Sequence, residues 1–249
     1  MDIAKKHNLR VVEDSCETVG ATYGGKSVGS FGDINCFSTY ASHIVVTGVG
    51  GFCCTDSGEL AVMIKGLYNH GRDGVYHSID DDDKNNIRMI GRRFNFVHSG
   101  YSYRATELES ALGVGHIQNI KKELKKRQNI AEQFTEGLLR FEEMGYINLP
   151  AIHPKATHSF MLYPIFCTLR TDRDKLMLYL EKHGVMTRYL MSLLNQPIVV
   201  KLFGDLQNEY PVAQSLIKNA FLIGCHPWLS QEDVKYVLDT FRGYFKRYG

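Results

Sequence analysis

Short apolar runs separated by glycine-rich turns dominate the first part of the chain. Residues 9–12 and 52–55 are such runs, and we expect each of them to be a strand. The connection at 21–32 is rich in glycine and predicts irregular backbone that can wrap close to a ligand. Ser57 then precedes an amphipathic pattern over 60–68, which predicts a helix. This order of elements is typical of an α/β protein.

A long helical pattern follows residue 106. Thr106 suits a helix N-cap, and Glu109 is its matching capping-box partner. The apolar residues that recur at helical spacing predict one buried stripe: Ile117, Ile120, Leu124, Ala131, Phe134 and Leu138. Lysine and arginine over 121–127 form the opposite face. We interpret that face as solvated rather than as a nucleic-acid surface, because no aromatic residues interleave with its charges.

A polar stretch with prolines at 148–157 predicts a linker. The patterns beyond it predict strands at 159–168 and 185–190 and helices at 172–183, 211–219 and 231–244. We therefore expect two domains, a large one over 1–147 and a small C-terminal α+β domain over 148–249.

Composition narrows the function classes. The 249 residues are 44% hydrophobic and 22% charged, and the net charge is +2. Such a small net charge produces no strong electrostatic field that would indicate binding to nucleic acid or to a membrane surface. No signal peptide or membrane-length apolar run is visible, which favours a cytoplasmic protein. The six cysteines lie mostly in apolar runs, so we expect buried free thiols. We interpret the acidic run 80–83 as a solvated loop and expect no metal site.

Three polar residues follow the predicted strands at positions suited to chemistry. Asp14 ends the first strand, Ser38 opens a polar turn, and His43 comes five residues later, before the paired glycines 50–51. A carboxylate, a small hydroxyl and a basic side chain at strand ends suit an anionic, heteroaromatic ligand.

The run VVEDSCETVGATYGGKSVGSFGDINCFSTYASH at 11–43 resembles the DegT/DnrJ/StrS-type sugar aminotransferases, which depend on pyridoxal phosphate (PLP). Weaker likenesses lie in GYSYRATE (100–107), GVMTRYL (184–190) and FLIGCHPWLSQED (221–233). The resemblance implies the α/β PLP fold-type I, the aspartate aminotransferase-like class with a largely parallel sheet. It also implies a homodimer, and an N-terminal portion that we expect this chain to lack.

The resemblance assigns cofactor contacts to four residues. Asp14 would pair with the pyridine nitrogen, Ser38 with the phosphate, and Glu17 would lie near the ring hydroxyl, where aminotransferases usually have glutamine. Ser102 stands where the family has an asparagine that reaches the neighbouring subunit's phosphate. The alternatives are a strand-end cap for Asp14 and ordinary surface roles for Ser38 and Glu17.

His43 stands where the family has the lysine that bonds covalently to the cofactor. An imidazole cannot replace that amine, but it can move protons near neutral pH. Histidine at this position resembles a subgroup, the 3-dehydratases of nucleotide-linked 4-keto-6-deoxy sugars such as GDP-4-keto-6-deoxymannose. The cofactor would then be used as pyridoxamine phosphate (PMP), and His43 would remove a proton and assist loss of the C3 hydroxyl.

The resemblance also implies the partners. A nucleotide-linked keto sugar would be the substrate in deoxysugar or polysaccharide synthesis, with glutamate as an amino donor. Arg104 and Arg188 would hold their anionic groups, or else form surface salt bridges. Two other functions stay open: a sugar aminotransferase of the same family, and an inactive fragment or partner-binding subunit in which His43 is structural.

Overall fold

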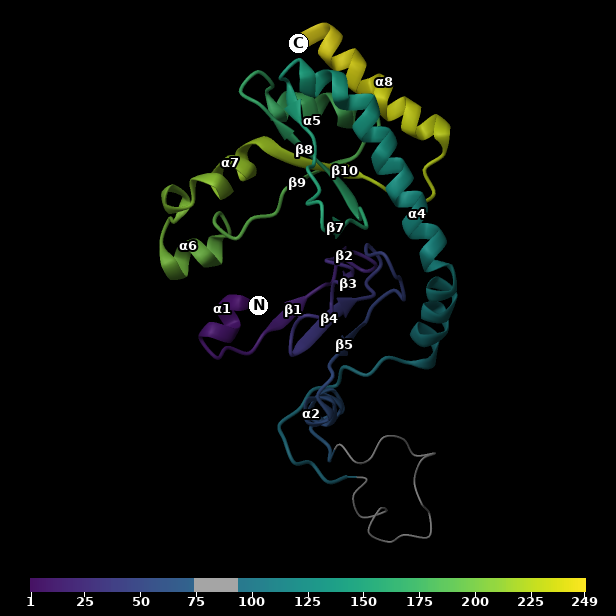
Figure 1. Cartoon of the computed structure of the whole chain (residues 1–249), viewed down its shortest axis with the longest axis vertical. Helices are drawn as coiled ribbons and strands as arrows, with labels where there is room; N and C mark the ends of the chain where they lie inside the picture. The colour runs from purple at the N-terminus through teal and green to yellow at the C-terminus, as the bar shows by residue number, and fades with distance from the viewer. Residues whose placement is uncertain (74–93) are drawn as a thin grey trace. The chain divides into compact units, whose positions relative to one another are not determined.

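The computed structural model describes residues 1–73 and 94–249 (Figure 1). The chain divides into two compact units, one formed by 1–121 with 155–157 and the other by 122–154 with 158–249. These limits differ from the expected division at 147/148, because the C-terminal half of the long helix packs its apolar stripe into the second unit's core. The division by function, into a cofactor-binding domain and a small domain, stays a prediction.

The described residues of the first unit form two small sheets. One has the order β1-β4-β5, with β1 parallel to β4 and β4 antiparallel to β5. The other has the order β3-β2-β7. The elements of this unit are α1 (Asp2–Lys6), β1 (Val12–Asp14), β2 (Thr22–Tyr23), β3 (Lys26–Ser27), β4 (Ile34–Ser38), β5 (Gly51–Cys54), α2 (Gly58–Tyr68) and β7 (Ala156–Thr157).

The first predicted strand begins three residues later than expected. Asp33 accounts for the shift, because its carboxylate accepts a hydrogen bond from the Val11 amide at 2.8 Å and replaces the strand partner there. The predicted helix after Ser57 is confirmed as α2, and the Ser57 hydroxyl accepts from the Leu60 amide. The strand predicted at 52–55 is confirmed as β5, displaced by one residue.

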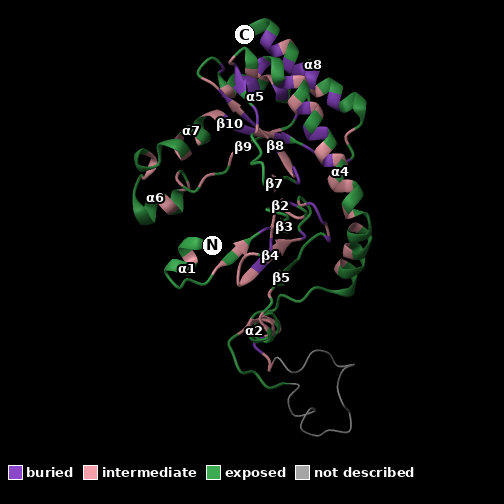
Figure 2. Cartoon of the chain, in the orientation of Figure 1, coloured by how far each residue is buried: buried purple, intermediate pink, exposed green. Residues whose placement is uncertain are grey.

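The second unit is built on an antiparallel sheet with the order β6-β8-β10-β9. Along β8 buried and half-buried residues alternate, so one face of the sheet is covered. Figure 2 shows the buried residues gathered on the strands and helices of this unit. Its elements are β6 (Ile147–Asn148), β8 (Leu162–Cys167), α5 (Arg173–Lys182), β9 (Thr187–Tyr189), α6 (Pro197–Phe203), the 3-10 turn η1 (Gln207–Glu209), α7 (Pro211–Asn219), β10 (Ala220–Gly224) and α8 (Gln231–Tyr248).

Helix α4 (Glu107–Glu143) is the long helix that the pattern predicts. Thr106 precedes its first residue, and the Glu109 carboxylate accepts from the Thr106 amide at 2.7 Å, which is one of the two bonds of a capping box. The Thr106 hydroxyl accepts from the Leu108 amide at 3.3 Å. The predicted stripe is buried only in its later part: Ala131, Phe134 and Leu138 are inside the core, whereas Ile117 is 53% exposed. The core that covers the stripe begins at Arg127, where the helix reaches the sheet of the second unit.

All six cysteines are free thiols, as expected, but their burial differs from the prediction. Cys167 and Cys225 are buried, whereas Cys53 and Cys54 are exposed. The reason is that β5 lies at the edge of its three-stranded sheet and all four of its residues are exposed. An apolar run on an edge strand has no layer above it to bury its side chains.

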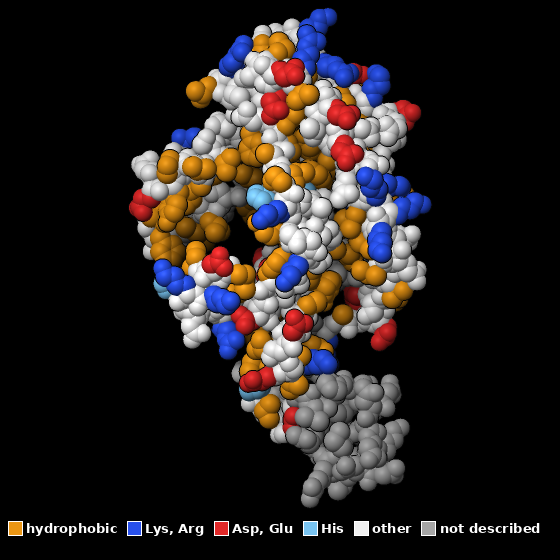
Figure 3. Space-filling model, in the orientation of Figure 1, with side chains coloured by type: hydrophobic (Ala, Val, Ile, Leu, Met, Phe, Trp, Pro, Cys, Tyr) orange, Lys and Arg blue, Asp and Glu red, His pale blue; other side chains and the backbone are white. Residues whose placement is uncertain are grey.

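Helices α6 and α7 carry exposed apolar side chains, among them Ile198, Leu202, Phe203 and Val212, and hydrophobic atoms gather there in Figure 3. Within 1–73 and 94–249, no helix is long and apolar enough to cross a membrane. The acidic run at 80–83 lies outside the described residues.

Candidate functional site

The parallel strands β1 and β4 end side by side, at Asp14 and Ser38. Asp14 lies directly opposite Cys36, two residues before Ser38. Paired residues of neighbouring strands project to the same face, and residues two apart along a strand share that face. The register therefore brings the predicted carboxylate and hydroxyl to one end and one face of the sheet. Ligands of open α/β sheets bind at such carboxyl ends.

Asp14 is held as an exposed carboxylate by the turn that follows it. The Cys16 amide donates to the Asp14 carboxylate at 3.2 Å, which is an Asx-turn. Hydrogen bonds from the Cys16 thiol and amide lower the pKa of Asp14. Burial raises this pKa by a smaller amount, and the charge of His43 lowers it further. Asp14 is thus ionised at neutral pH, and the structure brings it near His43.

His43 lies on the loop between β4 and β5, and contacts on both sides of the histidine hold this loop in place. The hydroxyls of Thr39 and Thr47 are buried and hydrogen-bonded to each other at 2.6 Å. Ile44 and Val45, which follow the histidine, are each only 2% exposed. The His43 Nδ1 atom is buried and has no hydrogen-bond partner among the residues described. Burying a ring nitrogen without a hydrogen-bond partner costs free energy, unless a bound ligand or another group supplies the missing hydrogen bond.

Ser38 stands at the start of the same loop. Its Oγ accepts a hydrogen bond from the Tyr40 amide at 3.2 Å, so the hydroxyl proton is free to be donated. The Tyr40 ring meets the His43 imidazole edge-on, with centroids 6.1 Å apart. Ser38, Tyr40 and His43 therefore form one polar wall beyond the strand ends.

Glu13 is a residue that the sequence analysis missed. Its carboxylate accepts hydrogen bonds from the amides of Gly29, Phe31 and Gly32 at 2.6, 2.9 and 3.3 Å and from the Ser15 hydroxyl at 3.1 Å. Burial alone would raise the pKa of Glu13, but these hydrogen bonds outweigh it and the pKa lies below its ordinary value. Glu13 thus fixes the glycine-rich connection to the strand that ends in Asp14. The position of Glu13 next to Asp14 could have indicated this role. Side chains alternate along a strand, so Glu13 projects to the face opposite Asp14.

Ser102 and Arg104 lie together in another part of the first unit. Ser102 pairs with Asn69 through a backbone bridge, and the Arg104 guanidinium donates to the Ser102 Oγ at 3.4 Å. Glu17 is exposed in the turn after β1. Arg188 belongs to the second unit, where it lies exposed on β9 opposite Leu222 of β10. The roles assigned to these residues stay predictions.

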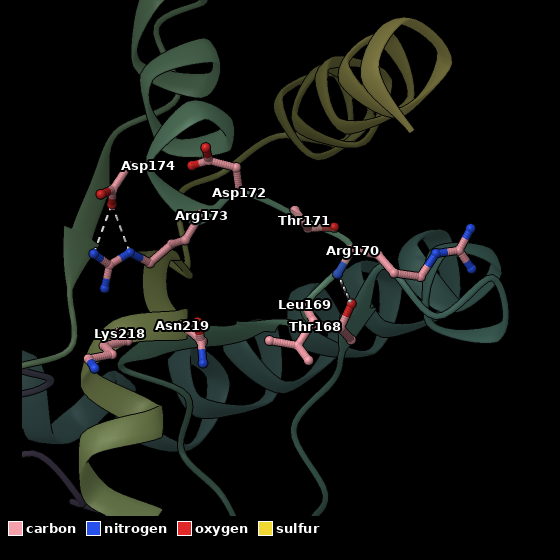
Figure 4. A pocket seen from close by; sticks show the side chains of 9 residues that line it. All are labelled: Thr168, Leu169, Arg170, Thr171, Asp172, Arg173, Asp174, Lys218 and Asn219. Carbon is pink, nitrogen blue, oxygen red and sulfur yellow. Dashed lines mark hydrogen bonds and ion pairs between the residues drawn. The ribbon is translucent and has the colours of Figure 1, made fainter. Parts of the chain in front are cut away.

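A hollow of about 460 Å³ lies in the second unit, between the start of α5 and the end of α7 (Figure 4). None of the residues that the sequence analysis singled out lines it. Its most buried charge, Arg173, is already paired with Asp174 at 2.8 Å and bonded to the Ile217 carbonyl. Its two carboxylates are paired as well, Asp174 with Arg173 and Asp172 with Lys175, so the hollow offers no unpaired acid and the candidate site lies at the ends of β1 and β4.

The sequence pattern of the DegT/DnrJ/EryC1/StrS aminotransferase family matches residues 1–242. The chain belongs to this family. Similar relatives include the lipopolysaccharide biosynthesis protein RfbH of Salmonella typhimurium, 29% identical over 98% of this chain and 58% of the relative. GDP-perosamine synthase of Caulobacter vibrioides is 27% identical over 96% of this chain and 59% of the relative. The predicted family is thereby confirmed.

Solved structures of family members share the fold. An aminotransferase from Psychrobacter cryohalolentis superposes with a TM-score of 0.87 at 25% identity, covering 100% of this chain and 65% of that one. The E. coli GDP-4-keto-6-deoxy-D-mannose-3-dehydratase with bound hydrated PLP gives a TM-score of 0.80 at 23% identity, covering 96% and 62%. The predicted PLP fold-type I class is confirmed. The chain spans about three fifths of the length of these curated relatives.

Proposed function

We propose that this chain forms part of an enzyme that binds PLP or PMP and removes the C3 hydroxyl from a nucleotide-linked 4-keto-6-deoxy sugar. The observation that carries the proposal is His43, which stands on the loop beyond Ser38 with its Nδ1 atom buried and without a hydrogen-bond partner among residues 1–73 and 94–249. The family that the sequence resembles has lysine at this position. A family member with histidine there keeps a proton-transfer group but has no amine to bond to the cofactor.

The residues present fit the cofactor. The Asp14 carboxylate is ionised and exposed, so it can pair with a protonated pyridine nitrogen. The Ser38 hydroxyl retains a proton to donate to a phosphate. The unpartnered His43 Nδ1 calls for a polar group at the same strand ends. When bound, PMP would supply the amine that condenses with the sugar ketone and a ring that accepts electrons.

The roles of the chain's own residues follow from these contacts. Asp14 keeps the ring nitrogen charged, and Ser38 orients the phosphate. His43 accepts a proton at its imidazole and returns one to the departing C3 hydroxyl as water leaves. Glu17 and Ser102 are proposed to complete the cofactor contacts. Arg104 and Arg188 are proposed to hold the nucleotide phosphates or the carboxylate of glutamate, the proposed amino donor.

The partners are proposals as well. The names of relatives, such as GDP-perosamine synthase, refer to nucleotide sugars, and this supports a nucleotide-linked keto sugar as substrate in polysaccharide synthesis. The exposed apolar side chains of α6 and α7 support a homodimer, since large exposed apolar patches mark interaction sites. Sedimentation velocity tests this pairing, and a monomer at every concentration would refute it. A cytoplasmic location agrees with the composition and remains part of the proposal.

A product assay tests the function. The chain is incubated with PMP, GDP-4-keto-6-deoxymannose and glutamate, and the sugar is followed by mass spectrometry. We expect the C3 hydroxyl to be replaced by hydrogen, so that the sugar loses one oxygen atom while glutamate supplies the two electrons by way of PMP and ends as 2-oxoglutarate and ammonia. We expect His43→Gln to abolish this change while PMP binding persists. His7→Gln, a change at an exposed histidine next to α1, is the matched control. A His43→Gln variant that works at the unaltered rate would refute the proposal.

The same assay separates the alternative functions. A sugar that gains an amino group at C4 would show a sugar aminotransferase, the activity that several relatives are named for. A chain that binds neither PLP nor PMP would be a non-catalytic subunit. The absence of a lysine at position 43 is the reason we favour dehydration over amino transfer.

A further inference from the structure

Two cysteines face each other across the sheet that carries the candidate site. Cys36 on β4 is paired in register with Cys53 on β5. Their sulfur atoms are 3.8 Å apart, and both are free thiols. This distance is van der Waals contact, well above the roughly 2.05 Å of a disulfide bond.

The register gives this pair a geometry that a disulfide can adopt. The Thr39 amide donates to the Gly50 carbonyl at 3.0 Å, so Thr39 and Gly50 form a hydrogen-bonded pair. Hydrogen-bonded and non-hydrogen-bonded pairs alternate along an antiparallel ladder, which makes Cys36 and Cys53 a non-hydrogen-bonded pair. Cα atoms in such pairs lie about 4.5 Å apart, inside the range of about 4.4–6.8 Å found for disulfides. The sulfurs can therefore bond without moving the strands apart.

We propose that Cys36 and Cys53 are a reversible dithiol–disulfide site that responds to a disulfide oxidant such as oxidised glutathione. The Cys53 thiolate attacks one glutathione sulfur, and one reduced glutathione leaves with a proton. The Cys36 thiolate then attacks the Cys53 sulfur, and a second reduced glutathione leaves. The chain loses two electrons and two protons, and the oxidant gains both.

Exposure decides the order of these steps. Cys53 is exposed on the edge strand, whereas Cys36 is half-buried, so the oxidant meets Cys53 first. Local burial, and then the contact with Cys36, raise the pKa of Cys53. A thiol of raised pKa exchanges slowly, so oxidation has to be followed to equilibrium.

Oxidation would also reach the candidate cofactor site, and this second part rests on the proposed function. The Cys36 carbonyl accepts from the Ser15 amide at 2.9 Å, directly after Asp14, and Asp14 lies opposite Cys36 in the sheet. Closing the sulfurs by roughly 1.8 Å, from contact to bond, fixes the Cys36 side chain to β5 and stiffens the part of β4 that pairs with Asp14. Because coupling is reciprocal, bound PMP should shift the glutathione ratio at which half of the chains are oxidised.

The experiment equilibrates the full chain with graded ratios of oxidised to reduced glutathione, quenches it with acid, and blocks free thiols by alkylation. Trypsin cannot separate the two cysteines, because no lysine or arginine lies between Lys26 and Lys65. Chymotrypsin can, by cleavage after Phe37 and Phe52. We expect a chain that has lost two hydrogen atoms, and a disulfide-linked peptide pair that joins Cys36 to the Cys53 segment.

Matched variants make the result specific. Cys54→Ser alters the exposed neighbour of Cys53 and should leave the bond intact, whereas Cys36→Ser should leave only a glutathione adduct. Circular dichroism checks that each variant is folded. A bond that instead joins Cys54 or Cys16, or only mixed and intermolecular disulfides in the unaltered chain, would overturn the proposal. An unchanged half-oxidation ratio with PMP would overturn only the coupling to the cofactor site.

Discussion

Replacing Glu13 by glutamine tests whether one carboxylate organises the strand end that carries Asp14. The glutamine keeps one oxygen but turns an NH2 group toward amides that also donate. The Gly29 amide donates to one carboxylate oxygen at 2.6 Å and the Phe31 amide to the other at 2.9 Å, so the NH2 group removes one of these short bonds and the other is left on a neutral oxygen. A hydrogen bond to a charged group contributes about 1.5 kcal/mol or more. The loss of one such bond and the weakening of the other together cost about 2 kcal/mol, because water reaching this half-buried carboxylate limits the loss.

The assay is urea unfolding combined with amide hydrogen exchange. We expect Glu13→Gln to lower the unfolding free energy by about 2 kcal/mol and to speed exchange at Gly29, Phe31 and Gly32 first. Glu17→Gln makes the same chemical change at an exposed glutamate and should leave unfolding and the exchange of these three amides unchanged. Equal urea midpoints for Glu13→Gln and the unaltered chain would refute the reasoning.

The pH dependence supplies a second check of the same carboxylate. The pKa of Glu13 is lower in the folded chain than its ordinary value. Its contribution to stability is therefore fully present above the unfolded pKa of roughly 4.3 and is lost as the pH falls through the folded pKa. The difference between Glu13→Gln and the unaltered chain should shrink below about pH 4. A difference that grows on acidification would contradict the assignment.

Three further predictions concern the site and its supporting backbone. His43→Lys should bond covalently to PLP, because it restores an amine there; borohydride reduction should trap the product, and an untrapped cofactor would disprove the alignment of His43. Asp14→Asn should weaken PLP binding at least tenfold, since the amide cannot hold the ring nitrogen protonated; unchanged binding by fluorescence titration would leave Asp14 as a turn residue only. Gly71→Ala should destabilise the Ser102 segment by about 1–3 kcal/mol, because the residue has φ of 80° and an added Cβ would lie 1.9 Å from the His98 carbonyl oxygen. Unaltered thermal unfolding of that variant would refute this packing.

Local rules predicted much of the fold, since they depend on neighbours in the sequence. Ser57 and Asp172 cap the helices expected after them, and α7 has the predicted limits. Gly184 follows α5 with φ of 75°, as a helix stop requires. Burial was harder to predict, because the exposure of Cys53 follows from the edge position of β5, which the strand's own residues do not encode.

The candidate site was predicted as residue types but not as an arrangement. Asp14 and His43 were singled out from the sequence, and the structure brings them near each other. The three amides bound by Glu13 and the register that joins Cys36 to Cys53 depend on pairing between segments distant in the chain. Such pairings have no signature in either segment alone.

The loop that presents residue 43 is held by side chains other than residue 43 itself. The Thr39–Thr47 hydrogen bond and the buried Ile44 and Val45 fix its course from either side of the histidine. One amino-acid replacement at this position can therefore exchange a proton carrier for an amine while the loop keeps its shape. During evolution, a family built on such a loop can move between eliminating a hydroxyl and transferring an amino group without first having to evolve a new scaffold.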